Sequence, residues 1–151
     1  MLSVFKLNHI LQKVFIVKVY KFKSMKKIVE IITEKRFFKE LKIAVPEMTL
    51  YDRPFVHNTL GLLCSFTKEL VESAPATRIE RIKSGQEDIL MRIGLFLNRC
   101  WFEETSSVMN AVMVSYFEST DKKTYLAIRP YIILSLDKEA RRYLKWWRGK
   151  R

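Results

Sequence analysis

Residues 86–102 read QEDILMRIGLFLNRCWF. Apolar side chains recur in this stretch every three or four residues, at Ile89, Ile93, Phe96, Leu97, Cys100 and Trp101. A period near 3.6 residues is typical of an amphipathic helix that buries one face. Glu87 and Asp88 fall in the first turn, where acidic side chains interact favourably with the helix dipole. The stretch therefore predicts a helix over 86–102.

Upstream of this stretch, the pattern predicts two more long helices. From Met25 the apolar residues follow helical spacing until Pro46, which stops the helix. Residues 47–53 are expected to form a loop, and Pro54 suits the first turn of a helix that runs to about Glu72. The positions expected to be buried in these two helices are Ile28, Ile31, Ile32, Phe38, Leu41, Val45, Phe55, Leu60, Leu63, Phe66 and Leu70.

A linker and a helix cap separate these helices from residues 86–102. Residues 73–76 read Ser-Ala-Pro-Ala and are expected to form the linker. Thr77 and Glu80 then match a capping box, in which each residue's side chain binds the other's backbone N–H. Ser84 and Glu87 repeat that spacing seven residues later. Either a short helix over 78–83 ends at Gly85, or the second match is accidental.

Downstream, the sequence predicts three further helices. Residues 108–117 permit a strand, but Met109, Ala111 and the surrounding helices favour a helix. A turn at 119–121 and a short helix before Pro130 follow. Asp137 suits the N-cap of a last helix over 138–148 that ends at Gly149. The predicted fold is mainly α, a single compact bundle-like domain of five or six helices.

Residues 14–23 differ from this helical pattern. They are rich in β-branched and aromatic residues, and Tyr20 and Phe22 alternate with Lys21 and Lys23, which predicts an extended arm with a partly basic face. We therefore separate residues 1–24, a basic N-terminal arm or targeting segment, from a helical domain over 25–151. A mitochondrial transit peptide stays open, although residues 1–24 contain no Arg and only two Ser.

The cysteines and the uncharged runs indicate the cellular environment. Cys64 and Cys100, 36 residues apart, are expected to be reduced, buried thiols in a reducing compartment. The longest uncharged runs are too short to span a bilayer. We expect an intracellular protein of the cytoplasm or nucleus, with the mitochondrion as the alternative.

Residue types that form active sites are sparse. His9 and His57 are the only histidines, and the four glycines are too scattered to form a phosphate-binding loop. His57 and Cys64 would lie about 10 Å apart along a helix, which is too far for a direct hydrogen bond. We predict a protein without catalytic residues, metal or cofactor.

Positive charge is concentrated at the two ends of the chain. Residues 1–29 carry seven Lys and no acid, and residues 138–151 carry seven Lys or Arg and one acid. Residues 30–137 sum to −1 within a total charge of +12. This distribution predicts that the ends contact an anionic partner while the near-neutral body folds.

The C-terminal segment interleaves these cations with aromatic residues. On a continuous helix Arg141, Lys145 and Arg148 would form one basic stripe that neutralises phosphates, and Trp side chains could stack on bases. An equally weighted explanation is that the aromatic residues pack on the body and the cations form a solvated face. The candidate nucleic-acid-binding residues are Arg141, Arg142, Lys145, Trp146, Arg148, Lys150, Arg151, Lys18, Lys21 and Lys23.

Three functions are compatible with these patterns. The first is a non-enzymatic basic protein of a nucleic-acid assembly, with RNA favoured over DNA. Its layout resembles that of many ribosomal proteins in charge pattern alone. The second is a helical protein–protein interaction subunit of a larger complex, in an organelle or elsewhere in the cell. The third is a peripheral membrane protein that uses Trp146 and Trp147 at an anionic lipid surface.

Overall fold

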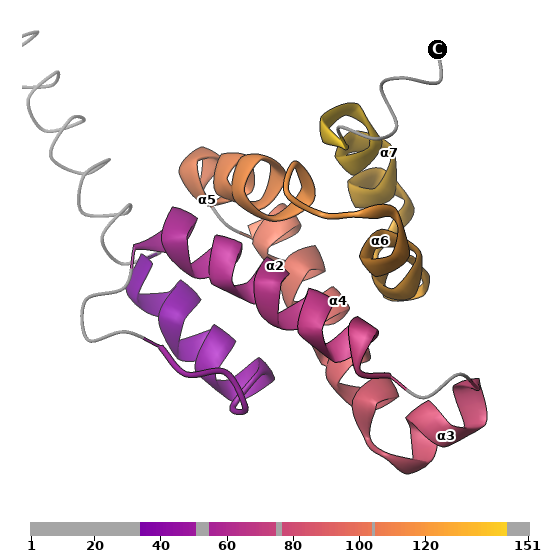
Figure 1. Ribbon diagram of the computed structural model, residues 1–151. Coiled ribbons are helices and arrows are strands. Elements are labelled where there is room, and N and C mark those ends of the chain that lie inside the picture. Colours follow the sequence, from indigo (N-terminus) through magenta and orange to yellow (C-terminus); the bar gives the residue numbers. More distant parts are fainter. Residues whose placement is uncertain (1–33, 51–54, 75–76, 104, 145–151) are drawn as a thin grey trace, which may run out of the picture. The chain divides into compact units, whose positions relative to one another are not determined.

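The computed structural model describes residues 34–50, 55–74, 77–103 and 105–144. The chain divides into two units, Met1–Lys35 and Arg36–Arg151. Every regular element in the described ranges is a helix, which confirms the mainly helical prediction and roughly the expected number of helices (Figure 1). A helix described over residues 34–44 precedes α2 (Val56–Glu72), α3 (Arg78–Lys83), α4 (Gln86–Glu103), α5 (Ser106–Ala111), the π-helix η1 (Val112–Phe117), α6 (Lys122–Ile128), the 3-10 helix η2 (Arg129–Tyr131) and α7 (Leu134–Tyr143).

The 34–44 helix ends where the sequence predicts, two residues before Pro46. Leu41 and Val45 are buried as expected. Phe37, which the helical pattern did not single out, is fully buried, whereas Phe38 is only partly buried against the core. The aromatic residue that this helix buries fully is therefore Phe37, one residue before the Phe38 of the prediction.

Two contacts from α4 hold the 34–44 helix in place. The ring centroids of Phe37 and Phe96 lie 5.3 Å apart. Arg92 Nη1 donates a hydrogen bond to the carbonyl of Ala44 at 2.5 Å. Because the last carbonyls of a helix have no partner within the helix, this bond satisfies an acceptor that would otherwise need water.

The helix α2 follows the predicted apolar face only in part. Leu60 and Leu63 are buried, and Phe66 and Leu70 are partly buried against the core. The predicted burial of Phe55 is wrong, since its side chain is 70% exposed. Phe55 precedes the helix with an extended backbone (φ −106°, ψ 142°), so its side chain leaves the helical face.

Polar side chains complete the buried face of α2. Thr67 is fully buried and donates its hydroxyl hydrogen bond to the carbonyl of Leu63 at 2.6 Å. The hydroxyl of Tyr116 in turn donates to Thr67 Oγ1 at 3.1 Å. The buried hydroxyls of Thr67 and Tyr116 therefore both have a partner, as the cost of burying an unpaired polar group requires. Burial raises the pKa of Tyr116 well above its ordinary value.

The capping box at the start of α3 is confirmed. Thr77 Oγ1 accepts a hydrogen bond from the Glu80 N–H at 3.3 Å, and the Glu80 carboxylate accepts one from the Thr77 N–H at 3.3 Å. Gly85 has a φ of 79°, in the left-handed region that glycine adopts without strain. The short helix over 78–83 thus ends at Gly85, and α4 begins at the next residue.

The helix α4 confirms the prediction over 86–102 and packs closely against η2. A Cβ atom on Gly94 would lie 2.4 Å from Tyr131 Cβ, so this approach requires glycine. One turn later, Asn98 Nδ2 donates to the carbonyl of Tyr131 at 2.9 Å. Asn98 Oδ1 accepts from the N–H of Ile133, also at 2.9 Å. These contacts attach the start of α7 to α4.

Residues 108–117 are helical as predicted, but the second half is a π-helix. The N–H of Glu118 donates to the carbonyl of Met113, five residues earlier, at 2.9 Å. The wider turn of a π-helix suits the buried pattern here, which consists of two adjacent pairs: Val112 with Met113 and Tyr116 with Phe117. This face packs on α2.

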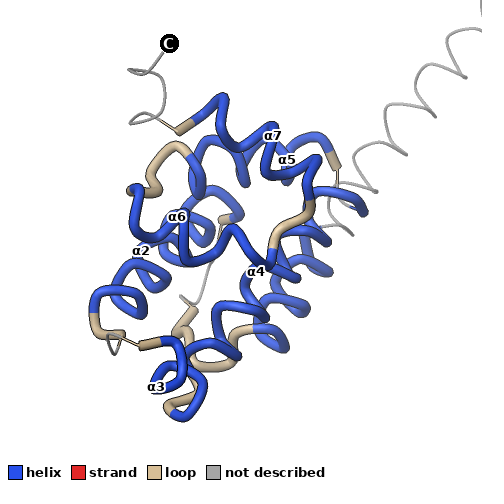
Figure 2. Tube along the Cα trace, turned by 90° about the vertical axis from the view of Figure 1, so that its right-hand side faces the viewer, coloured by secondary structure: helices blue, strands red, loops and turns tan. Residues whose placement is uncertain are grey.

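Figures 1 and 2 place α3 at the opposite end of α4 from α5 and α7. The two cysteines of the core, Cys64 and Cys100, are buried and free, as predicted. Within the described ranges, every helix is too short or too polar to cross a lipid bilayer. The predicted arm over 14–23, the domain boundary at residue 24, and positions Ile28, Ile31, Ile32 and Pro54 lie outside the described residues.

Candidate nucleic-acid interface

The last described helix, α7, differs from the helix that the sequence predicts over 138–148. It begins at Leu134 and ends at Tyr143, and Leu144 has an extended backbone (φ −61°, ψ 110°). Ile133, not Asp137, occupies the N-cap position, while Asp137 lies inside the first turn and is only 4% exposed. The predicted cap is therefore wrong, because the Asp137 carboxylate bonds to side chains of neighbouring segments instead.

Asp137 is the centre of a buried network that joins α6, η2 and α7. Its Oδ1 accepts a hydrogen bond from the Tyr125 hydroxyl, and its Oδ2 accepts one from Arg141 Nη2 at 2.5 Å. Arg141 Nε also donates to the Tyr125 hydroxyl at 3.1 Å. Arg129 Nε lies 3.5 Å from Asp137 Oδ1. A buried carboxylate is stable in such a place because donors and cations replace the water it loses.

The network raises the pKa of Tyr125 and of Arg141. Burial raises the pKa of Tyr125, and the hydrogen bond to Asp137 raises it further. The hydrogen bonds with Tyr125 and then with Asp137 raise the pKa of Arg141. Near neutral pH, Tyr125 is thus a neutral donor and Arg141 a cation. Arg141 has a structural role in this network, and its contact with nucleic acid stays a prediction.

Of the predicted basic stripe, only Arg141 lies within the described residues. Arg141 lies in α7, but Leu144 leaves the helical path before Lys145 is reached. Arg142 is on the exposed side of α7, with a side chain that is 70% exposed and paired with Glu139 at 2.8 Å. The other candidates lie outside the described residues: Lys145, Trp146, Arg148, Lys150, Arg151, Lys18, Lys21 and Lys23.

The structure exposes cations that the list of candidate residues leaves out. Lys122 and Lys123 are exposed at the start of α6, Lys138 is exposed in the middle of α7, and the Arg129 side chain is 49% exposed. The sequence held a signal for them, because residues 121–151 contain ten Lys or Arg and three acids. The basic C-terminal region therefore begins at α6 and not at residue 138.

All three acids of this region are bound within the protein. Asp137 belongs to the buried network, and Glu139 pairs with Arg142. Asp121 is the N-cap of α6, where Oδ1 accepts the Thr124 N–H at 2.8 Å. Burial would raise the pKa of Asp121, but hydrogen bonds from Thr124 outweigh it and the pKa is lowered. The surface over α6 and α7 thus carries an excess of positive charge.

The residues weighed for catalysis have separate partners. Cys64 Sγ lies 3.5 Å from Thr120 Oγ1, and burial raises the pKa of its thiol. His57 Nδ1 lies 2.8 Å from Ser115 Oγ. Within the part of the chain that the structure describes, no three His, Cys, Asp or Glu side chains gather in a way that could hold a metal ion.

Comparison with protein-family models, with curated proteins and with solved structures finds no match to this chain. Function is therefore inferred from the residues and their geometry.

Proposed function

We propose that this protein is a non-enzymatic RNA-binding protein that contacts phosphates through the surface of α6 and α7 and the basic residues that follow. One observation carries the proposal: the acids of residues 121–144 are all bound internally, whereas Lys122, Lys123 and Lys138 are exposed. The chain continues from there with four more Lys or Arg and no acid. A surface of this kind attracts a polyanion and releases its counterions.

The position of two lysines supports a role beyond folding. Lys122 and Lys123 are the first two residues of α6. Cations at a helix N-terminus are opposed by the helix dipole, so they lower the stability of the helix slightly. Folding therefore gives no reason for this pair, whereas contact with an anionic ligand does.

The aromatic residues favour RNA over duplex DNA as the ligand. Trp146 and Trp147 lie among the cations of the C-terminal segment. Aromatic side chains stack on unpaired bases, which single-stranded regions of RNA expose and a regular duplex does not. An intracellular place of action accords with this ligand and with the two free, buried cysteines.

The test compares two triple variants of equal charge. Lys122→Gln/Lys123→Gln/Lys138→Gln removes three cations from the proposed interface. Lys39→Gln/Lys42→Gln/Lys83→Gln removes three exposed cations from other helices. Binding of a fluorescent single-stranded RNA is measured by anisotropy over a range of salt concentrations. With about six phosphate contacts, the slope of log K against log salt should be roughly −4.

The interface variant should weaken binding at least about tenfold and make the slope shallower by roughly 2, since each phosphate contact on a single strand contributes about 0.7. The control variant should keep the wild-type slope. A wild-type slope near zero would contradict the proposal. Equal weakening by both variants would show that net charge, and not this surface, determines binding.

A further inference from the structure

The solvent-facing side of α4 carries exposed apolar residues that the proposed RNA interface does not use. Met91 is 40% exposed, Leu95 is 56% exposed and Phe102 is 69% exposed. Their spacings of four and seven residues place them on one face of the helix. Exposed apolar side chains that cluster in this way mark an interaction surface more often than a bare solvent face.

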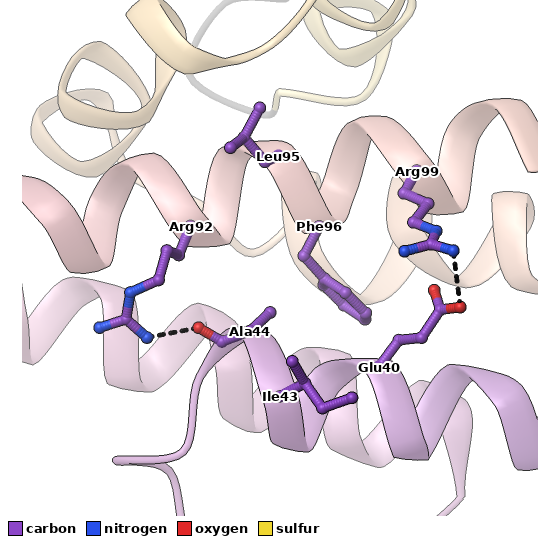
Figure 3. Close-up of a pocket in the computed structure, with 7 residues that line it drawn as sticks. All are labelled: Glu40, Ile43, Ala44, Arg92, Leu95, Phe96 and Arg99. Carbon is purple, nitrogen blue, oxygen red and sulfur yellow. Dashed lines mark hydrogen bonds and ion pairs between the residues drawn. The ribbon is translucent and has the colours of Figure 1, made fainter.

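The elements beside α4 leave this face open. On one side, Arg92, Phe96 and Arg99 point toward the 34–44 helix, while Leu95 points away from it (Figure 3). On the other side, Gly94 and Asn98 contact the segment around Tyr131. A pocket of about 240 Å³ adjoins the open face and is lined by Glu40, Ile43, Ala44, Arg92, Leu95, Phe96 and Arg99.

The open face has the spacing of a helix–helix contact. Residues 88, 91, 95, 98 and 102 follow one another at intervals of three and four, which is the repeat of coiled-coil contact positions. We call these five residues (Asp88, Met91, Leu95, Asn98 and Phe102) the α4 strip. Asn98 lies at its covered edge, where its amide is bonded to Tyr131 and Ile133. In the sequence, the apolar middle of the strip is preceded by the Asp88 carboxylate and followed by the Asn98 amide and the Arg99 guanidinium.

We propose that residues 88–98 of the α4 strip bind the same residues of a second copy of this chain, with the two helices antiparallel about a twofold axis near residue 93. In this register Met91 faces the partner's Leu95, and Leu95 faces the partner's Met91. Asp88 then faces the partner's Asn98 and lies beside the partner's Arg99. A twofold axis makes each of these contacts occur twice.

Charge complementarity selects this occupant and this register. The Asp88 side chain is 59% exposed and the Arg99 side chain is 46% exposed, so both can reach a partner. Within the chain they pair at the edge of the face, Asp88 with Arg92 at 2.9 Å and Arg99 with Glu40 at 2.9 Å. A parallel pairing would instead bring Asp88 beside the partner's Asp88. An antiparallel pairing centred on residue 95 would place Asp88 against the partner's Phe102.

The first test measures the mass of the full chain, freed of nucleic acid by nuclease, by sedimentation equilibrium. The wild-type mass should rise with concentration from 18.0 kDa toward twice that value, with a dissociation constant on the order of micromolar. Leu95→Glu should remain a single chain over the same range. Leu126→Glu replaces a residue of α6 that is 48% exposed, and it should dimerise like the wild type.

The second test exchanges the charges of Asp88 and Arg99, and its double variant also serves as a control for folding. Asp88→Arg alone and Arg99→Asp alone should each raise the dissociation constant about tenfold or more, because like charges then meet twice. The double variant Asp88→Arg/Arg99→Asp should recover wild-type dimerisation to within about threefold. Recovery in the double variant also shows that both substitutions are compatible with folding.

Four results would overturn the proposal. They are a wild-type chain that stays single at all concentrations, an assembly larger than two chains, a Leu95→Glu variant that dimerises normally, and a double charge exchange that fails to restore dimerisation. The first would leave another protein's helix as the occupant of this face.

Discussion

The α6–α7 end and the α4 strip differ in which residues remain exposed after their charged side chains have paired. Around α6 and α7 the acids are bound inside the protein, and Lys122, Lys123 and Lys138 are left exposed. Along α4 the acids and arginines pair with each other at the edges, and Leu95 is left exposed. What remains at the surface after internal pairing differs between the two regions, and on this difference we base the two proposed partners.

The largest expected effect is a loss of stability at the α6–α7 end, where it distinguishes cations with a structural role from exposed ones. Asp137→Ala removes the carboxylate that Arg129, Arg141 and Tyr125 share. Breaking a buried ion pair usually costs about 3–5 kcal/mol. Because Arg141 is 30% exposed and regains some water, we expect a loss of roughly 3 kcal/mol in the free energy of unfolding. Urea denaturation measures it.

Glu139→Ala is the matched control, since it removes the partner of Arg142, whose side chain is exposed. A surface pair of this kind contributes about 0–1 kcal/mol. If the two variants lost equal stability, Asp137 would not be what holds α6, η2 and α7 together.

The next prediction compares the change in stability when a glycine is replaced on a covered and on an uncovered side of a helix. Gly94→Ala places a Cβ 2.4 Å from Tyr131 Cβ, so η2 must move away from α4. Overpacking of this kind costs about 1–3 kcal/mol. Gly61→Ala in α2 meets nothing within 4 Å and should raise stability by about 0.5–1 kcal/mol.

Thermal unfolding of both glycine variants provides the measurement. The two variants should change the stability in opposite directions, although the substitution is the same. A Gly94→Ala variant as stable as the wild type would mean that η2 is not packed against α4 as described, and the open side of α4 would then be wider than the α4 strip.

A smaller effect concerns the ion pairs beside the α4 strip. The hydrogen bond from Arg92 lowers the pKa of Glu47 below its ordinary value of 4.5. A lowered pKa in the folded state means that the pair stabilises the fold above the unfolded pKa and loses this contribution as the pH falls through the folded pKa. Because the Glu47 side chain is 38% exposed, we expect a contribution of at most about 0.5 kcal/mol.

Chemical denaturation of wild type and Glu47→Gln at several pH values checks this sign. The difference in stability should be constant from about pH 6 to 8 and shrink below about pH 4.5. A difference that grew as the pH fell would contradict the assigned pairing.

The smallest effect tests whether the exposed lysines of α6 serve folding. Lys122→Gln and Lys123→Gln remove cations from a helix N-terminus, where the dipole opposes them. Each should leave stability unchanged or raise it by about 0.3 kcal/mol. A clear loss of stability in urea denaturation would give the lysines a structural role and weaken the case for the RNA interface.

The parts of this fold that the sequence predicts are those fixed by neighbours along the chain. The periodic apolar residues of α4 and the Thr77–Glu80 cap depend only on local geometry, and both are confirmed. The end of the 34–44 helix before Pro46 follows from the backbone of proline alone.

The errors concern residues whose partners are distant in the sequence. Asp137 has the residue type of an N-cap, but Tyr125, twelve residues earlier, draws its carboxylate into a buried network. The π-helix at Tyr116 depends on packing against α2, which no local pattern reveals. Phe37 and Phe38 both fit a helical period, and only the position of Phe96 decides between them.

The sequence predicts the positive charge of the C-terminal region but not which of its cations are exposed in the fold. Counting cations near the C-terminus identified Arg142, which is exposed. The same count could not separate Arg141, which is bound to Asp137, from Lys138, which is exposed three residues earlier. That distinction depends on which acids are already paired in the folded chain.

The most direct test measures RNA affinity and chain association together in two variants. Lys122→Gln/Lys123→Gln/Lys138→Gln should lose RNA affinity and still form dimers. Leu95→Glu should remain a single chain and keep the wild-type RNA affinity per chain. The central claim, that two separate surfaces bind two different partners, predicts this crossed result. If either variant lost both properties while its far-UV circular dichroism remained helical, the two surfaces would not be separate and the claim would be wrong.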